Sequence, residues 1–319
     1  MTTQRQLDAM LNELRPQLQE ALLAVFADMQ SGVDYPALEL AIAQRDAAGV
    51  EAALNIDDGP FAPYMLIAMT IYLRYGQRFG PTLGVRFTPN MPVIQADIAD
   101  ATARMTEDAR QGIRDAVERR MMSVDGANRR EAARAIIREI KPIIGLSRPQ
   151  ISYVESMRER LLSGDPEQMR AVLSGQKLRD KRYDALIKRA IKAARNGDAP
   201  VLTSAKVDEI TGKYAARMLR KRAMEIARAE VDQYAEAAKY EAAGKIEGGA
   251  IKTWRHSSIY INARPDHVGM SGRSVPFDES FIMADGVAMR YAHDPRGGAK
   301  HNASCRCRTV YSKAPANVV

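Results

Sequence analysis

The chain has 319 residues, of which 46% are hydrophobic and 6% aromatic, and it carries a formal net charge of +8. Its 16 methionines, together with abundant alanine, arginine and glutamate, are typical of a helix-rich protein. Only two cysteines are present, which excludes a disulfide framework and predicts a reducing compartment. The polar, amphipathic start predicts no signal peptide. The longest apolar run, residues 64–73, is too short to cross a bilayer and predicts a buried helix.

Charge is distributed unevenly along the chain. Residues 1–100 carry a net charge of −6, whereas residues 178–230 carry +7 and residues 251–319 carry +5. A basic middle and tail are typical of proteins that lie against a polyanion such as DNA. A solvated Arg/Lys face of a helix would give the same pattern, so the sequence leaves both interpretations open.

The N-terminal part of the chain predicts a succession of helices. Leucines recur at helical spacing from Leu7 to Leu18, and residues 37–54 predict a second helix. Glycine and proline are frequent around residues 80–92, so we expect only a short extended piece at residues 84–87 there. Long amphipathic stretches then predict helices over residues 94–122 and 129–141.

The middle of the chain carries clear helix boundaries. Ser147 and Gln150 have the spacing of a capping box, which predicts a helix start. Residues 177–198 predict a strongly basic helix that ends at Asn196 and Gly197. A long helix is expected from residue 204 to residue 243, where Gly244 ends it.

Beyond Gly244 the helical periodicity disappears. Residues 250–262 are rich in β-branched and aromatic residues, residues 287–293 are expected to be extended, and residues 305–312 alternate like a strand. We therefore predict an α+β protein, in which a long, mainly α-helical N-terminal and central body is followed by a small mixed or β-rich C-terminal module. We predict three divisions: an N-terminal helical region at residues 1–140, a basic helical region at residues 141–244, and the C-terminal module at residues 245–319.

Both cysteines and all four histidines lie between residues 256 and 307. In an extended segment, Cys305 and Cys307 project to the same side, because strand side chains alternate. Two thiols with imidazoles can form a tetrahedral structural zinc site, and the candidates are His293 or His301 together with His267 or His256. The alternative is that the cysteines pack as small hydrophobic side chains beside hydrogen-bonded histidines. In either case we expect the Cys-Arg-Cys segment to pair with the strand around Trp254.

Three stretches, in order, resemble the phage head-morphogenesis family typified by the Mu F-like minor head protein. They are "RAMEIARAE" at residues 222–230, Trp254 followed by "ARPDH" and "GMSGRSVPFDESF", and "GVAMRYAHDPRGGAKHNASCRCRTV". The resemblance covers residues 145–312. The chain departs from the family pattern at Ala229, where Thr is usual, and at Ser304, where Asn usually precedes Cys-Arg-Cys.

The resemblance implies a minor capsid protein of a tailed bacteriophage. Such a protein associates with the portal protein, the major capsid protein or the inner shell. It lies in the host cytoplasm during assembly and afterwards inside the virion, in the capsid interior or at the portal vertex. The family includes proteins thought to leave the head with the packaged double-stranded DNA. The family motifs imply structural roles for six residues: Arg222, Arg228, Glu230, Trp254, Arg264 and Gly269. Of these, Arg228 and Glu230 are expected to hold the long helix to the C-terminal module, and Trp254 is expected to anchor the core of that module.

A non-enzymatic assembly protein is the main prediction, because no nucleophile–base pair and no carboxylate–metal set stand out. The neighbouring Asp278 and Glu279 are explained by a turn or a salt bridge. The alternative is a non-specific DNA-binding protein that accompanies the genome. A third interpretation is an enzyme whose active site lies in the C-terminal module. The candidate DNA contacts are Lys181, Arg182, Lys188, Arg189, Lys192, Arg220 and Lys221.

Overall fold

The computed structural model describes residues 3–122, 128–257 and 263–315. The chain forms two compact units. Unit 1 comprises Met1–Leu22, Phe61–Ala101 and Ala223–Val319, and unit 2 comprises Leu23–Pro60 and Thr102–Arg222. The predicted α+β class is confirmed, because helices dominate and the strands are confined to the C-terminal region.

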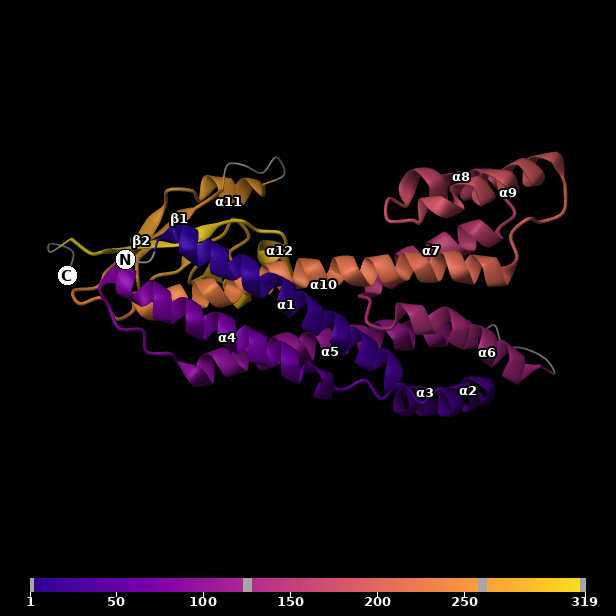
Figure 1. The fold of residues 1–319 in the computed structure, drawn as a ribbon, viewed down its shortest axis with the longest axis horizontal. Coiled ribbons are helices and arrows are strands. Elements are labelled where there is room, and N and C mark those ends of the chain that lie inside the picture. Colours follow the sequence, from indigo (N-terminus) through magenta and orange to yellow (C-terminus); the bar gives the residue numbers. More distant parts are fainter. Residues whose placement is uncertain (1–2, 123–127, 258–262, 316–319) are drawn as a thin grey trace. The chain divides into compact units, whose positions relative to one another are not determined.

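Twelve α-helices lie within the described residues (Figure 1). They are α1 (Gln4–Ser31), α2 (Tyr35–Gln44), α3 (Ala47–Leu54), α4 (Ala62–Phe79), α5 (Met91–Met121), α6 (Arg129–Ile140), α7 (Arg148–Leu162), α8 (Pro166–Gly175), α9 (Asp184–Asn196), α10 (Ser204–Ala243), α11 (Pro265–Gly269) and α12 (Gly298–Asn302). Helices α1, α5 and α10 contribute residues to both units.

Local signals explain most helix boundaries in unit 2. The backbone N–H of Ser147 donates to the side chain of Gln150 at 3.1 Å, as the predicted capping box requires. The basic helix α9 ends at Gly197, whose φ of 74° closes the helix in the left-handed region. The helix expected over residues 37–54 is instead two helices. Arg45 adopts a φ of 58° and ends α2, and the Asp46 carboxylate then accepts from the Gly49 N–H and caps α3.

The helices of unit 1 pack around a leucine stripe on α1. The residues Leu7, Leu14, Leu18 and Leu22 are all at most 2% exposed, as their helical spacing predicts. Helix α4 contacts the second half of α10 through Tyr64. The Tyr64 hydroxyl lies 2.8 Å from that of Tyr234. No strand forms in the described residues 84–87, where an extended piece was expected. The chain there follows a short 3₁₀ turn, Gly80–Leu83.

A three-stranded antiparallel sheet lies at the centre of the C-terminal module (Figure 1). Its strands are β1 (Ala250–Arg255), β2 (Ser274–Pro276) and β5 (Arg308–Lys313), in the order β2-β1-β5. Trp254 pairs with Thr309, so the segment after the cysteines does return to the strand around Trp254. Strands β3 (Phe281–Ile282) and β4 (Ala288–Met289) form a separate hairpin. Residues 258–262 of the strand predicted over 250–262 lie outside the described residues.

Both cysteines belong to the hydrophobic core of this module. Trp254 is fully buried at its centre, with ring centroids 5.4 Å from His267 and 5.3 Å from Phe281 in edge-to-face geometry. The cluster of buried residues comprises Trp254, Met270, Val275, Phe281, Met283, Met289, Ala292, Cys305 and Cys307. The core of the module is therefore small, and it brings the two thiols next to the aromatic rings.

Among the described residues, no helix combines the length and the apolar character that crossing a membrane requires.

Candidate metal centre

Helix α11 positions His267 in the core of the module. Arg264 precedes the helix in extended conformation, and Pro265 occupies its first turn. The Arg264 guanidinium donates to the carbonyl oxygen of Ala303 at 2.6 Å, which ties α11 to the turn before the cysteines. His267 is 2% exposed. The predicted family residue Arg264 thus holds the helix that carries the central histidine.

The two cysteines lie in the segment that leads into β5, not in the strand itself. The strand predicted over residues 305–312 begins only at Arg308. Ser304 adopts a φ of 56°, which turns the chain just before Cys305. The backbone N–H of Cys307 then donates to the Cys305 sulfur at 3.3 Å. Both thiols are buried and point to the same place, although strand alternation is not the cause.

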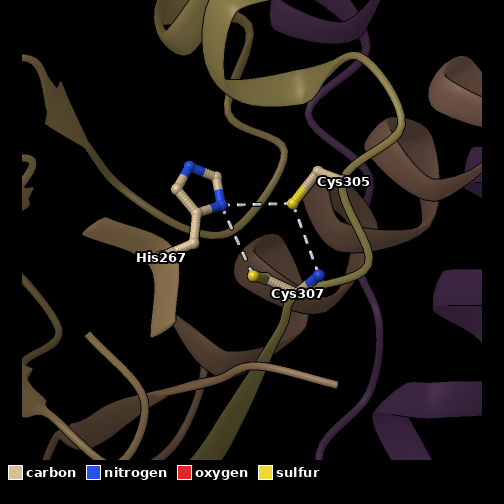
Figure 2. Close-up of side chains that lie close together, drawn as sticks. All are labelled: His267, Cys305 and Cys307. Carbon is tan, nitrogen blue, oxygen red and sulfur yellow. Dashed lines mark hydrogen bonds between the residues drawn. The ribbon is translucent and has the colours of Figure 1, made fainter. Parts of the chain in front are cut away.

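One ring nitrogen contacts both sulfurs (Figure 2). The Nδ1 atom of His267 lies 3.5 Å from the Sγ atom of Cys305 and 3.5 Å from that of Cys307. The three ligand-type atoms all lie within 4.8 Å of one another. The structure therefore brings together three of the six residues named as candidate zinc ligands.

The predicted ligand His301 lies one step away from the sulfurs. Its Nδ1 atom is 3.1 Å from the Nε2 atom of His267, and the two rings are stacked. The Nε2 atom of His301 is 3.0 Å from the carboxylate of Asp285, which Lys300 also contacts at 2.6 Å. These contacts lower the pKa of Asp285, first through the Lys300 hydrogen bond and then through that of His301, against the effect of desolvation. His301 thus supports His267 and does not reach the thiols.

The remaining two histidines flank the cysteine pair. The Nδ1 atom of His256, just after β1, lies 3.7 Å from the Cys307 sulfur. His293 is 1% exposed, and its backbone has a φ of 65°. Its Nδ1 atom has no hydrogen-bond partner among the described residues. All four histidines of the chain therefore belong to the surroundings of the two thiols.

The two thiols do not titrate alike. The pKa of Cys305 is lowered, first because Cys307 hydrogen-bonds to its sulfur and then because His267 does so and His293 lies nearby, while burial opposes the shift. The pKa of Cys307 is raised, first by its hydrogen bond with Cys305 and then by burial. Burial lowers the pKa of His293, but contact with Cys305 outweighs this effect and raises it overall. In the absence of a metal ion, the cluster therefore favours one ionised and one neutral thiol over two thiolates.

A polar cavity of about 500 Å³ adjoins the cluster within unit 1. His256, His293 and Cys307 form part of its wall. Its charged lining includes Arg306, whose guanidinium is 3.6 Å from Asp232, and Arg308, which is 3.1 Å from Asp8. The charges in the wall are thus largely paired with one another.

Two motif residues of α10, Arg222 and Glu230, contact other helices. Arg222, in unit 2, is 7% exposed and pairs with Asp108 at 3.0 Å. Glu230, which is expected together with Arg228 to hold α10 to the C-terminal module, accepts a hydrogen bond from Tyr64 of α4. The Nε atom of Arg228 is buried without a hydrogen-bond partner among the described residues. At Gly269 an added methyl group would meet no atom within 4 Å, so packing does not explain a glycine there.

Other buried charges carry the contact between α10 and the tail. The Glu236 carboxylate accepts from the backbone N–H of Thr309 at 2.9 Å and from Lys239 at 2.6 Å. Lys252 of β1 is fully buried and donates to the carbonyl of Arg290 at 2.8 Å. Desolvation is the main cause that lowers the Lys252 pKa to about 8. The sequence analysis missed these groups and Asp285, because charged residues in a helix or turn are normally exposed.

The candidate DNA contacts are exposed in unit 2. Lys181 and Arg182 lie in the 3₁₀ turn Lys181–Tyr183, and Arg182 is held by Asp180 at 2.7 Å. The others lie on α9 and α10, and all are exposed: Lys188, Arg189, Lys192, Arg220 and Lys221.

The fold and the cluster together define a helical protein with a small C-terminal module built around cysteines and histidines. The family model described as phage Mu protein F like protein matches residues 167–310, somewhat less than half of the chain. The resemblance predicted from the motifs is thereby confirmed for this segment. No curated protein and no solved structure matches the chain.

Proposed function

We propose that the protein is a non-enzymatic minor capsid component that joins the phage head during assembly, at the portal or the inner shell. The observation that carries this proposal is the family match, which spans most of α8, all of α9 and α10, and the C-terminal module as far as residue 310 in one continuous segment. In this role the helices supply surface for partner proteins, and the C-terminal module supplies a compact folded end. Its partners are the portal protein, the major capsid protein or both.

The first prediction concerns particles. In phage lysates fractionated on a density gradient, the protein should co-migrate with heads and survive washing with moderate salt. Cross-linking of purified heads followed by mass spectrometry should join it to portal or shell subunits. A variant truncated after residue 244 lacks the C-terminal module, so it shows whether this module is needed for the association with heads. Recovery of the full chain only as free protein, never with heads, would contradict the proposal.

A second candidate function is non-specific binding of packaged DNA, favoured by the exposed cations of unit 2. Among the described residues, Lys188, Arg189, Lys192 and Arg220 form no ion pair, so their charges are available to a polyanion. Such binding draws its free energy from counterions released by phosphate contacts, and it is therefore salt-dependent.

The second prediction tests this binding with the full chain and a duplex of arbitrary sequence. Affinity should fall steeply with salt, and the triple variant Lys188→Glu, Arg189→Glu, Lys192→Glu should reduce the slope of log K against log salt by up to about 3. The matched control, Arg104→Glu, Arg129→Glu, Arg130→Glu, makes the same change in net charge at exposed sites of unit 2. Equal losses in both variants would show a net-charge effect only, and a flat salt dependence would exclude the electrostatic contact.

A further inference from the structure

The contacts of His267 leave a chemical conflict at the centre of the cluster. Its Nδ1 atom faces two sulfurs at the same distance, 3.5 Å. A ring nitrogen has either one proton or one lone pair, so it can serve as partner to only one sulfur in a well-aligned hydrogen bond. A single positive ion placed between the three atoms would serve all of them.

The hydrogen-bond chain behind His267 indicates which form the nitrogen takes. The Asp285 carboxylate can only accept, so the Nε2 atom of His301, 3.0 Å away, is the donor in that contact. In neutral His301 the Nδ1 atom is then an acceptor, and it receives the proton of His267 Nε2 at 3.1 Å. The Asp266 carboxylate is 3.7 Å from the same Nδ1 atom, too far to reverse this direction by a hydrogen bond. With both histidines neutral, His267 therefore presents an Nδ1 lone pair to the two sulfurs, which is the form that binds a metal ion.

The spacing of the three atoms fits tetrahedral zinc. With Zn–S bonds of about 2.3 Å and Zn–N bonds of about 2.0–2.1 Å, tetrahedral angles place sulfur and nitrogen about 3.5–3.6 Å apart. Both distances from His267 to the sulfurs have this value, and the separation of His256 Nδ1 from Cys307, 3.7 Å, is close to it. Zinc-bound histidines are also commonly held through the other ring nitrogen, as His301 and Asp285 hold His267 here.

We propose that Cys305, Cys307 and the Nδ1 atom of His267 bind a structural Zn²⁺ ion. His256, whose Nδ1 atom lies 3.7 Å from the Cys307 sulfur, moves closer to the ion to become the fourth ligand. The ion joins three parts of the module that are distant in sequence: the end of β1, helix α11 and the segment before β5. His301 and Asp285 orient His267 without touching the ion. Because the core of the module is small, much of its folding free energy comes from metal binding. This inference is independent of the function proposed above.

The test begins with the metal content of the full chain, purified under reducing conditions from zinc-supplemented cells. We expect about one zinc per chain by elemental analysis, as for a single closed site. Replacement of the zinc by Co²⁺ should give the thiolate charge-transfer absorption and the strong visible bands of tetrahedral cobalt. Less than about a tenth of a zinc per chain, with no such cobalt spectrum, would overturn the proposal.

Variants assign the ligands. The double variant Cys305→Ser, Cys307→Ser should lose the zinc, whereas Val275→Ser, which also introduces a hydroxyl into the same buried cluster, should keep it. His301→Gln should keep the zinc but bind it about 10–100-fold more weakly. His256→Ala should weaken binding more than His293→Ala does. Full zinc content in the double cysteine variant would overturn the site, and a larger loss in His293→Ala would overturn the fourth ligand.

A measurement on the unaltered chain covers the case in which the cysteine variant does not fold. Zinc-bound thiolates react slowly with a disulfide reagent, so both cysteines should become reactive only after a chelator removes the metal, with release of the zinc in step. Thiols that are equally protected after chelation, with no metal released, would show that burial alone shields them and would overturn the site.

Discussion

Replacing Glu236 with alanine should lower the free energy of unfolding of unit 1 by about 3–5 kcal/mol. Glu236 and Lys239 are 3% and 4% exposed, and their side chains are 2.6 Å apart. Burial alone would lower the pKa of Lys239, but the charge of Glu236 outweighs it and the pKa is raised, so Lys239 stays protonated. The variant would leave Lys239 as a buried charge without its carboxylate and would also remove the acceptor of the Thr309 N–H. Trp254, the only tryptophan, lies in unit 1, so its fluorescence during urea unfolding measures this effect.

Two controls separate the buried charge from other effects of the substitution. In Glu236→Gln, Lys239→Met the amide oxygen still accepts from Thr309 and no charge is buried, so we expect a loss of only about 1–2 kcal/mol. The same helix also carries an exposed pair with the same spacing and distance, Lys206 and Glu209. Glu209→Ala should cost less than about 1 kcal/mol. A loss in Glu236→Ala no greater than in Glu209→Ala would refute the role of the buried pair.

Helix boundaries could be predicted wherever the signal was local. The long helix α10 has the predicted bounds, because residues 203–204 and Gly244 carry their own start and stop chemistry. The break between α2 and α3 could not be predicted in this way. It occurs at Arg45, a residue with no special tolerance for a positive φ, and neither glycine nor proline marks it.

The candidate site could be predicted in composition but not in arrangement. The concentration of cysteines and histidines was visible in the sequence, and so was the return of β5 to the strand of Trp254. The sequence did not indicate which side chains contact each ring nitrogen of His267. His301 and Asp285 are 16 residues apart, and they meet only because α12 packs beside the turn that carries Asp285. No periodicity encodes such a contact.

The contact between α10 and the C-terminal module also could not be predicted from the sequence. The RAMEIARAE motif drew attention to Arg228 and Glu230 but not to Glu236 and Lys239, which contact Thr309 of β5. Charged residues three apart on a helix normally form a solvated pair. Their burial depends on Thr309, about seventy residues further along the chain, and the sequence alone gives no sign of it.

Replacing Trp254 with alanine should destabilise unit 1 by about 3–5 kcal/mol, because a fully buried aromatic ring leaves a cavity that the neighbouring residues cannot fill. The ring contacts Phe281 and the edge of His267, so its loss also removes the packing that positions the central histidine. Hydrogen exchange measured by mass spectrometry should show faster exchange in β1, β5 and α11, with little change in unit 2. This method is needed because the variant has no tryptophan fluorescence.

The matched controls for this prediction vary ring size and burial separately. Trp254→Phe keeps an aromatic ring at the centre of the module and should retain part of the lost stability. Tyr153→Ala removes an aromatic side chain that is 58% exposed in unit 2, so it should change stability by less than about 0.5 kcal/mol. If Trp254→Ala left the exchange of β1 and β5 unchanged, Trp254 would not be the anchor of the module. The stability of the module would then rest on the cysteine–histidine cluster and on the Glu236 contact with Thr309.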